Sequence, residues 1–391
     1  MTAHRLALRR ARVTRVKLPL DMVYVSSMYI MNDTHRTIVE LVADDGSVGY
    51  GETLGTAEAF RLAAGLAQSL VGADLLNRNA LRQRFARTIF DNRNGRNGWS
   101  AYAGIELAAW DAMGKALGAS LSDLLGGARR SEVEVICPVP AAIVDAPMPR
   151  SELVAHFRDL HNVDRVVSYA QGMRARHGFR CFKYKSAGVE DDWDVAVMSA
   201  LRETLGPETA LRFDPNAAYT PRRSIALTRR MERLKLEFYE DPCEDIDGLA
   251  QVRAKVATPI ATNMCVTQLD HLAAAVRARP IDVLLADIYM WGGIVNYRAM
   301  AAAAAFFGIE PAVHSLFETG IGTALNLHLA AALPAIRRAN DSGHHVLAAD
   351  VIARDALAIR DGRMRVPTGA GLGVAIDAAA IDALAVERVE I

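Results

Sequence analysis

The chain has 391 residues, and its 45 basic and 45 acidic side chains give a formal net charge of zero at pH 7. This balance leaves no electrostatic footprint for nucleic acid or an anionic membrane, and no apolar run reaches the length of a membrane span, so we expect neither partner. Four widely spaced cysteines without a CxxC pair are typical of reduced thiols and favour a cytoplasmic protein.

The first third of the chain predicts an α+β unit, which we place at residues 1–131. Three strands are expected, at residues 11–18, 37–43 and 48–52. A loop is expected at residues 21–33, between the first two strands. A helix is predicted at residues 102–117, where apolar residues recur on one face and Gly118 follows as a stop signal.

From residue 132 onwards, short apolar runs alternate with amphipathic stretches. The apolar runs predict buried strands at residues 134–139, 181–185, 210–214, 238–240, 260–263, 283–287 and 309–314. The stretches between them predict helices at residues 151–177, 191–206, 221–234, 248–256, 267–278, 293–307 and 319–333. Seven or eight consecutive βα units favour a closed (β/α) barrel of the TIM type over an open sheet. We place this barrel at residues 132–352, with a weak eighth strand near residues 339–341.

Residues 353–391 depart from this alternation. A hairpin is predicted at residues 357–362. Gly369, Gly371 and Gly373 resemble a nucleotide-binding loop, but a strand-like apolar run follows where the phosphate fingerprint requires the start of a helix. We therefore interpret this segment as a glycine-rich loop.

Two lysines stand two residues apart in the predicted strand at residues 181–185, in a chain that has only six lysines. Because side chains alternate along a strand, Lys183 and Lys185 share one face. Lysine, unlike arginine, can lose its proton when it is partly buried, and it can then act as a base. For the pair taken alone, a solvated strand edge is the alternative interpretation.

The ends of consecutive predicted barrel strands carry polar residues at intervals of 23 to 29 residues: Lys185, Asp214, Glu240, Asn263, Asp287 and His314. In barrels of this type the carboxyl ends of the strands form the active-site face. Asp214, Glu240 and Asn263 offer three oxygen ligands and neither thiolate nor imidazole, which favours Mg²⁺ over zinc. Each acidic residue alone could instead cap the following helix, but three in register indicate a metal site.

Asp287 and His314 lie on adjacent predicted strands, so the carboxylate can orient the imidazole as a general base. The lysines stand on one side of the expected site and this pair on the other. Such a site suits removal of a proton α to a carboxylate. The metal and Lys183 would stabilise the enediolate, while Lys185 and His314 would address opposite faces of the α-carbon.

These motifs resemble those of the enolase superfamily, and within it the chain is most similar to the glucarate dehydratase branch. The matching segments are Phe182-Lys183-Tyr184-Lys185, Asp214-Pro215-Asn216, Tyr239-Glu240-Asp241-Pro242-Cys243, Ala261-Thr262-Asn263-Met264, Asp287 and His314-Ser315. The resemblance implies a modified barrel as the catalytic domain. It also implies a capping domain that residues 1–131 form together with the C-terminal segment 353–391.

The resemblance further implies a role for each site residue. Lys185 would be the base on one face of the substrate, and His314 with Asp287 the base on the other. Lys183 would contact the substrate carboxylate, and Asn216 would be a second substrate contact. Asp214, Glu240 and Asn263 would hold the metal.

Two positions distinguish branches of the superfamily. Asn263 indicates the glucarate dehydratase branch, because mandelate racemase and muconate cycloisomerase relatives usually carry an acidic residue there. After Ser315, however, the chain resembles those relatives and lacks the asparagine-rich segment of the glucarate dehydratases, which argues against a full hexarate as substrate. Within this segment Glu318 is predicted to contact the substrate, with a carboxylate at a helix N-terminus as the alternative.

The resulting hypothesis is a Mg²⁺-dependent dehydration of an acid sugar to a 2-keto acid. Racemisation, epimerisation or cycloisomerisation of a carboxylate is the alternative, because the second base could instead return the proton. A catalytically silent metal-binding barrel is the third possibility. We expect a small-molecule carboxylate as substrate and further copies of the chain in a homo-oligomer, whose size the sequence does not set.

Overall fold

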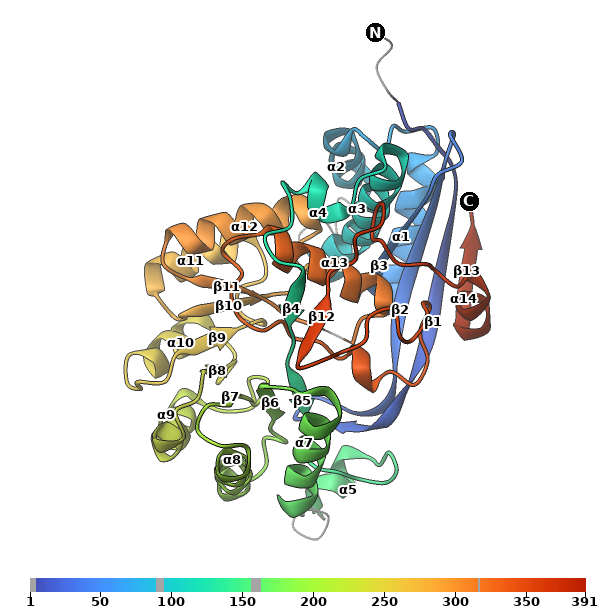
Figure 1. Ribbon diagram of the computed structural model, residues 1–391. Coiled ribbons are helices and arrows are strands. Elements are labelled where there is room, and N and C mark those ends of the chain that lie inside the picture. The colour runs from blue at the N-terminus through green and yellow to red at the C-terminus, as the bar shows by residue number, and fades with distance from the viewer. Residues whose placement is uncertain (1–4, 89–94, 156–162, 316) are drawn as a thin grey trace.

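The computed structural model describes residues 5–88, 95–155, 163–315 and 317–391. Its strands form an antiparallel four-stranded sheet, a parallel seven-stranded sheet and a small two-stranded sheet. Figure 1 shows the parallel sheet and its helices on the left and the antiparallel sheet on the right, with the C-terminal strand at the outer edge. The molecule therefore combines a (β/α) barrel with an α+β cap.

The antiparallel sheet has the strand order β13-β1-β2-β3. Its strands are β1 (Leu8–Val25), β2 (Ile30–Ala43), β3 (Val48–Leu54) and β13 (Ala385–Glu390). Three helices belong to this part of the chain: α1 (Ala57–Leu70), α2 (Arg78–Thr88) and α3 (Arg96–Leu117). Glycines let β3 lie directly on α3, because a Cβ atom added at Gly51 would stand only 2.1 Å from the carbonyl oxygen of Gly104. In this sheet the C-terminal strand β13 pairs with the N-terminal strand β1.

The prediction of a loop at residues 21–33 is wrong. Strands β1 and β2 continue as a hairpin to its tip, where Val25 pairs with Ile30. Pro19 interrupts the alternation in the sequence, but the pairing only shifts register between Pro19 and Tyr24 and then resumes. A bulge of this kind bends a hairpin without ending it.

The seven strands of the parallel sheet follow one another in chain order. They are β5 (Cys137–Val139), β6 (Cys181–Lys185), β7 (Ala210–Asp214), β8 (Phe238–Glu240), β9 (Ile260–Thr262), β10 (Val283–Ala286) and β11 (Glu310–Val313). The bounds of β6, β7 and β8 match the prediction, while β9, β10 and β11 end one residue before Asn263, Asp287 and His314. Those three residues therefore begin the loops at the active-site face.

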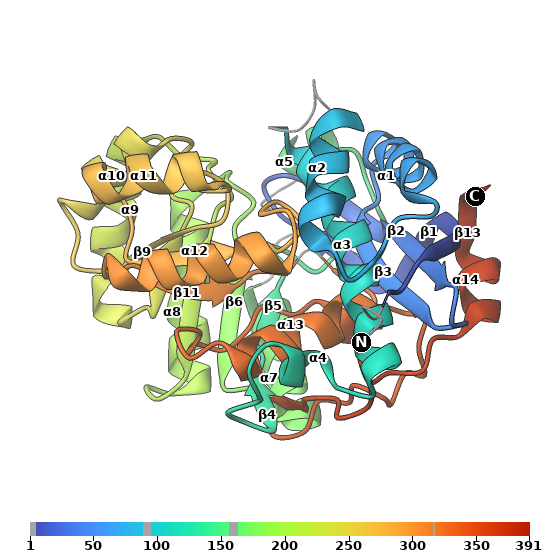
Figure 2. The same ribbon diagram turned by 90° about the horizontal axis from the view of Figure 1, so that it is seen from above.

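Helices alternate with these strands as predicted. They are α7 (Val163–His177), α8 (Asp191–Leu205), α9 (Pro221–Met231), α10 (Ile246–Arg253), α11 (Leu269–Ala278), α12 (Ile294–Phe306) and α13 (Gly320–Ala332). Within the single helix predicted at residues 151–177, the structure shows α5 (Arg150–Ala155) and α7, and residues 156–162 lie outside the described part. Seen from above in Figure 2, α8 to α12 lie on the side away from α1 and the antiparallel sheet.

The parallel strands bury two different faces, as their period of two requires. One face packs against the surrounding helices and is mostly apolar. The other face forms a separate small cluster inside the barrel: Phe238, Ala261, Val283, Leu285 and Ala312. Two residues further along the same faces come Glu240, Asn263, Asp287 and His314. On these four strands the polar residues thus follow an apolar level, whereas Lys183 and Arg212, in register with Phe238, bring charge to that level on β6 and β7.

The eighth strand of the barrel is reduced to a seam around Asn340. The Asn340 amide donates to Glu134 O at 2.8 Å, the Ile136 amide donates to Asn340 O at 2.9 Å, and the Asp341 amide donates to Val313 O at 3.1 Å. These three bonds connect the β5 edge of the sheet to its β11 edge. The prediction of a weak strand at residues 339–341 thus corresponds to an isolated bridge.

The remaining elements are short: α4 (Leu121–Leu124), β4 (Glu132–Glu134), η1 (Glu232–Leu234), η2 (His344–Val346), β12 (Arg363–Arg365) and α14 (Ala378–Leu384). The predicted hairpin turn is present, since Arg360 bridges Arg363, but β12 pairs with β4 rather than with residues 357–359. In the glycine-rich loop, the Leu372 amide donates to Asp111 of α3 at 2.7 Å.

A buried carboxylate joins the cap to the barrel beside the candidate site. Glu52 of β3 pairs with Arg36 of β2, with Nε and Oε1 2.5 Å apart. It also accepts hydrogen bonds from the amides of Thr319 and Gly322, at 3.0 and 2.9 Å. Because Thr319 caps α13, this carboxylate fixes the start of that helix and the end of the loop that follows β11.

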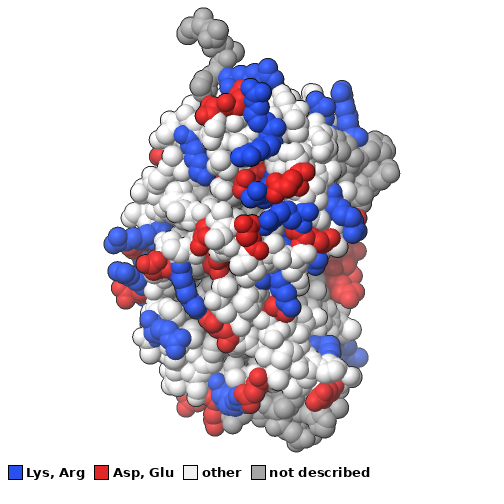
Figure 3. All heavy atoms as spheres, turned by 90° about the vertical axis from the view of Figure 1, so that its right-hand side faces the viewer, with Lys and Arg blue, Asp and Glu red and all other residues white. Residues whose placement is uncertain are grey.

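Among the described residues, no helix is both long and apolar enough to cross a bilayer. Figure 3 shows one face of the molecule, on which acidic and basic side chains are interspersed.

Candidate active site at the carboxyl ends of the barrel strands

A cavity of about 240 Å³ contains most of the predicted site residues. Its barrel wall includes Lys183, Lys185, Asn216, Asn263, His314, Ser315 and Asp341. The cap contributes Tyr24, Met28 and Tyr29 from the β1–β2 hairpin and Arg96 from α3. A larger cavity of about 940 Å³ borders α7, but no predicted site residue lines it. The smaller cavity is therefore the candidate site.

Hydrogen bonds hold the tip of the β1–β2 hairpin over this cavity. The hydroxyl of Ser27 donates to Pro215 O at 2.6 Å, in the loop that follows β7. Arg150 donates to Ser26 O at 3.0 Å and to Ala187 O at 2.7 Å, in the loop that follows β6. The cap side of the site is thus anchored to the barrel loops.

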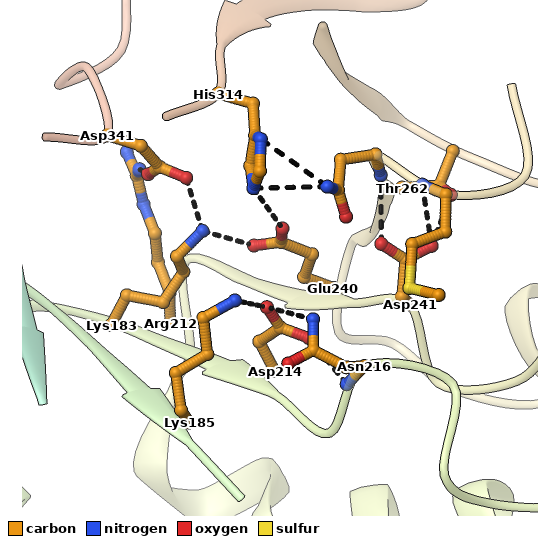
Figure 4. A network of polar contacts seen from close by, with 12 residues as sticks. Lys183, Lys185, Arg212, Asp214, Asn216, Glu240, Asp241, Thr262, His314 and Asp341 are labelled. Carbon is orange, nitrogen blue, oxygen red and sulfur yellow. Dashed lines mark hydrogen bonds and ion pairs between the residues drawn. The ribbon is translucent and has the colours of Figure 1, made fainter. Parts of the chain in front are cut away.

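The two lysines share one face of β6, as predicted, and each pairs with a different carboxylate. Lys183 Nζ lies 2.9 Å from Glu240 Oε2 and also contacts Asp341, while Lys185 contacts Asp214 (Figure 4). Burial lowers the pKa of both lysines, but the neighbouring carboxylates outweigh it and raise each pKa overall. In this arrangement both lysines are ammonium ions.

The three predicted metal ligands come from neighbouring strands, and two of them retain unpartnered oxygen atoms. Glu240 Oε1 and Asn263 Oδ1 are buried and have no hydrogen-bond partner. Asp214 accepts a bond from the Asn216 amide at 2.7 Å. Burial, and next the charge of Asp214, raise the pKa of Glu240 to about 8. Unpartnered buried oxygens beside clustered carboxylates are the environment that a hard divalent cation neutralises, so these residues fit a Mg²⁺ ion.

A second set of candidate ligands overlaps with the first. Among the described histidine, cysteine and acidic residues, Glu240, His314 and Asp341 form one group whose ligand atoms lie within 4.8 Å of one another. Lys183 contacts two members of this group. Imidazole is a poorer ligand than oxygen for Mg²⁺, and Asn263 offers an unpartnered oxygen, so the set with Asp214 and Asn263 fits better.

The predicted dyad is formed by neighbouring residues at a longer distance than a hydrogen bond. His314 Nδ1 lies 3.6 Å from Asp287 Oδ2, and Asp287 Oδ1 accepts from the Tyr289 amide at 2.9 Å. The Asn263 amide lies 3.1 Å from His314 Nε2. Burial lowers the pKa of His314 more than the nearby carboxylates raise it, so the imidazole is neutral and can accept a proton.

Asp241 supports the loop that carries Asn263. Its backbone is left-handed, with φ of 38°, and its side chain is fully buried. The carboxylate accepts bonds from the Thr262 hydroxyl and, at 2.9 Å, from the Asn263 amide. A non-glycine residue in this conformation is strained, and such strain is typical of functional loops.

Glu318 lies outside the residues that line the cavity. It is 2% exposed, and its Oε2 atom accepts from the Ser315 hydroxyl at 2.5 Å. Burial raises the pKa of Glu318 to about 7, against the opposing charge of Arg36. Glu318 therefore lies where the cap meets the barrel. Asn216, the other predicted substrate contact, lines the cavity and has an unpartnered Oδ1.

Sequence reasoning missed Asp341 and the tyrosines of the hairpin. Asp341 ends the weak eighth strand, so the strand-end rule that identified the other site residues would also have identified it. Tyr24 and Tyr29 lie in the segment predicted as a loop. The hydroxyl of Tyr24 is buried without a partner, and both tyrosines are close enough to affect the pKa of Lys185.

Comparisons with known proteins agree with this architecture. Residues 8–126 match the family model "Mandelate racemase / muconate lactonizing enzyme, N-terminal domain", and residues 165–380 match "Enolase C-terminal domain-like". A probable glucarate dehydratase from Streptomyces coelicolor is 34% identical, over 88% of this chain and 83% of that protein. D-galactarolactone cycloisomerase from Agrobacterium fabrum is 30% identical, over 92% and 93%. The structure of an enolase from Thermobispora bispora complexed with magnesium and formate superimposes with a TM-score of 0.87 at 35% identity, covering 97% of this chain and 92% of that one.

Proposed function

Because the chain belongs to the enolase superfamily, with an N-terminal domain of the mandelate racemase / muconate lactonizing enzyme type, we propose that it dehydrates a small hydroxy-carboxylate to a 2-keto acid. The observation that carries this proposal is that Lys185 and His314 line one small cavity. The unpartnered oxygens of Glu240 and Asn263 support it, since they fit the Mg²⁺ that such chemistry uses.

Asp214, Glu240 and Asn263 would hold Mg²⁺. When bound, the ion would stabilise the negative charge of an enediolate and offset the carboxylates that now raise the pKa of Lys185. Lys183 stays protonated between Glu240 and Asp341, and its ammonium meets the substrate carboxylate. Asn216 contributes its free Oδ1 to a substrate hydroxyl.

In the proposed dehydration, one base would stand at each face of the substrate. In the dehydration, one base removes the α-proton, and the electron pair of that C–H bond forms the enediolate. The β-carbon–oxygen bond then breaks. His314, which is neutral in the resting site and gains its proton from the α-carbon, passes that proton to the hydroxyl, which leaves as water. The resulting enol tautomerises to the 2-keto acid.

Racemisation or cycloisomerisation is the second candidate. It is supported by the similarity to D-galactarolactone cycloisomerase and by the apolar residues Met28, Met264, Met290 and Phe317 around the cavity. These side chains offer no hydrogen bond to the distal hydroxyls of a sugar acid. In this reaction the second base returns the proton and no water leaves.

The test is incubation of the Mg²⁺-loaded protein in D₂O with glucarate, galactarate, arabinonate, tartrate and mandelate. Keto acid formation is followed with semicarbazide, and loss of the α-proton signal by ¹H NMR. We expect keto acid from at least one hydroxy acid. Exchange without keto acid selects the second candidate, and the absence of both across the panel contradicts the proposal.

Variants assign the bases. Lys185→Ala and His314→Asn are each expected to lower kcat by about 100- to 10,000-fold, the usual contribution of a general base. Lys255→Ala, which removes an exposed lysine, is the matched control and keeps wild-type turnover. Wild-type turnover in Lys185→Ala would point to a metal-binding barrel whose lysine is not a base.

A further inference from the structure

The seam that closes the barrel is thin where it carries a site residue. Strands β6 and β7 pair over five positions, whereas the backbone pairing at the eighth position of the barrel consists of three bonds of Asn340 and Asp341 among the described residues. Asp341 contacts Lys183. A carboxylate on so short a stretch of paired backbone needs further support to keep a fixed direction.

Arg212 provides this support from across the barrel. It lies on β7, is fully buried, and points into the barrel, because it precedes Asp214 by two residues. Its guanidinium donates to Asp341 Oδ1 at 3.0 Å and to Ala339 O at 3.0 Å. Figure 4 shows its side chain rising beside Lys183 to reach Asp341. One planar group thus binds both the carboxylate and the backbone of the seam.

The third donor group of Arg212, its Nε–H, also has a hydrogen-bond partner. Nε lies 2.6 Å from Glu237 Oε2, and Glu237 Oε1 lies 2.8 Å from Arg338. Positive and negative groups therefore alternate without a gap through the barrel, in the order Arg338, Glu237, Arg212, Asp341, Lys183 and Glu240. A lysine could not replace Arg212, since an ammonium lacks the planar set of donors that binds three partners at once.

We propose that Arg212 is a positioning residue that fixes Asp341 and, through it, directs the Lys183 ammonium toward the substrate carboxylate. This inference rests on the proposed function for the role of Lys183, but its structural part does not depend on turnover. If Arg212 only stabilised the fold, its loss would leave the surroundings of Lys183 unchanged in the folded protein.

The first test observes Lys183 directly. The chain has six lysines, so protein labelled with ¹³C at the lysine ε-carbon gives few signals, and Lys183→Arg identifies the signal of interest by its absence. In Arg212→Met we expect the Lys183 signal to move toward the positions of the exposed lysines, and in Arg212→Lys to move in the same direction by less. Arg253→Met removes an arginine–aspartate pair elsewhere in the barrel and leaves the Lys183 signal in place.

A double-mutant cycle tests whether Arg212 acts through Asp341. Asp341→Asn alone should move the Lys183 signal, and adding Arg212→Lys should then have little further effect, because both changes break the same connection. Additive effects would overturn the inference. A Lys183 signal at its wild-type position in Arg212→Lys would overturn it too, and this variant keeps a positive charge in the barrel should Arg212→Met fail to fold.

Kinetics supply the second readout. With any acid that the wild type converts, Arg212→Lys is expected to raise KM and lower kcat/KM at least tenfold, while Arg253→Met keeps both values. Unchanged constants in Arg212→Lys would contradict the positioning role. Should the wild type convert none of the acids, the proposed function fails, and the lysine signals still decide whether Arg212 fixes Lys183.

Discussion

Glu106 is a single residue whose side chain links the cap to the barrel. Its contribution to stability depends on whether the carboxyl group is protonated. Glu106 lies on α3, is fully buried, and accepts hydrogen bonds from the amides of Ile294 and Val295, at 2.7 and 3.2 Å, at the start of α12. Gly293 makes room for it, since a Cβ atom there would stand 2.2 Å from Glu106 Oε2. Burial raises the pKa of Glu106 from 4.5 to about 7, against the opposing backbone bonds.

This shift predicts how stability depends on pH. The folded protein binds the Glu106 proton more tightly than the unfolded chain, so the stability that this group contributes is present at low pH and is lost as the pH rises from about 4.5 to about 7. At about 1.4 kcal/mol per unit of pKa, the loss is at most about 3.5 kcal/mol. Urea titrations give the free energy of unfolding of wild type and of Glu106→Gln. We expect the wild-type value minus the Glu106→Gln value to be more positive at about pH 5 than at about pH 8. A difference that grows with pH would contradict this assignment.

At the scale of elements, the contact between β3 and α3 depends on glycine. A Cβ atom at Gly51 would overlap the backbone of α3, and the next residue, Glu52, binds the start of α13. A change in the distance between β3 and α3 would therefore also displace Glu52 and the loop beside the cavity that Glu52 binds. No such constraint acts at Gly65, an exposed position of α1 with no atom within 4 Å of its added Cβ.

Two glycine substitutions should have opposite effects on thermal unfolding. Gly51→Ala forces the strand and the helix apart and is expected to cost about 1–3 kcal/mol or more. Gly65→Ala removes a flexible residue from a helix and is expected to stabilise the protein by about 0.5–1 kcal/mol. Calorimetric melting curves of both variants provide the check. Equal melting temperatures for Gly51→Ala and wild type would show that β3 and α3 can separate without cost.

The sequence predicted the elements whose pattern is local and missed those that depend on distant partners. The strand ends from Lys185 to His314 were predictable because period-two burial and the rule for parallel barrels place them without knowledge of contacts. The hairpin beyond Pro19 was missed because a register shift across two strands cannot be read from one of them. The surroundings of Glu318, near Arg36, could not be predicted because Arg36 stands nearly 300 residues away in the chain.

At the scale of the whole molecule, the cavity belongs to neither part alone. The barrel supplies the ionisable groups, and the cap supplies the hairpin and Arg96. Connections between the two parts include Glu52 to α13, Glu106 to α12, and the Ser27 hydroxyl to the loop that follows β7. The chemistry of the proposed site is thus set by the barrel strands, while the shape that selects a substrate is set by how the cap sits on them.

The seam at Asn340 should open more readily than the long ladder between β6 and β7. A local fluctuation there has to break only a few hydrogen bonds together, whereas one between β6 and β7 has to break a ladder over five positions. In native-state hydrogen exchange, the amides of Ile136 and Asn340 should therefore lose protection before those of Tyr184 and Phe213. Equal protection at the two places would mean that the barrel opens as one cooperative unit. Because Asp341 lies on the seam, each opening would also break the contact between Asp341 and Lys183, so a backbone fluctuation would change the charge environment of the proposed site.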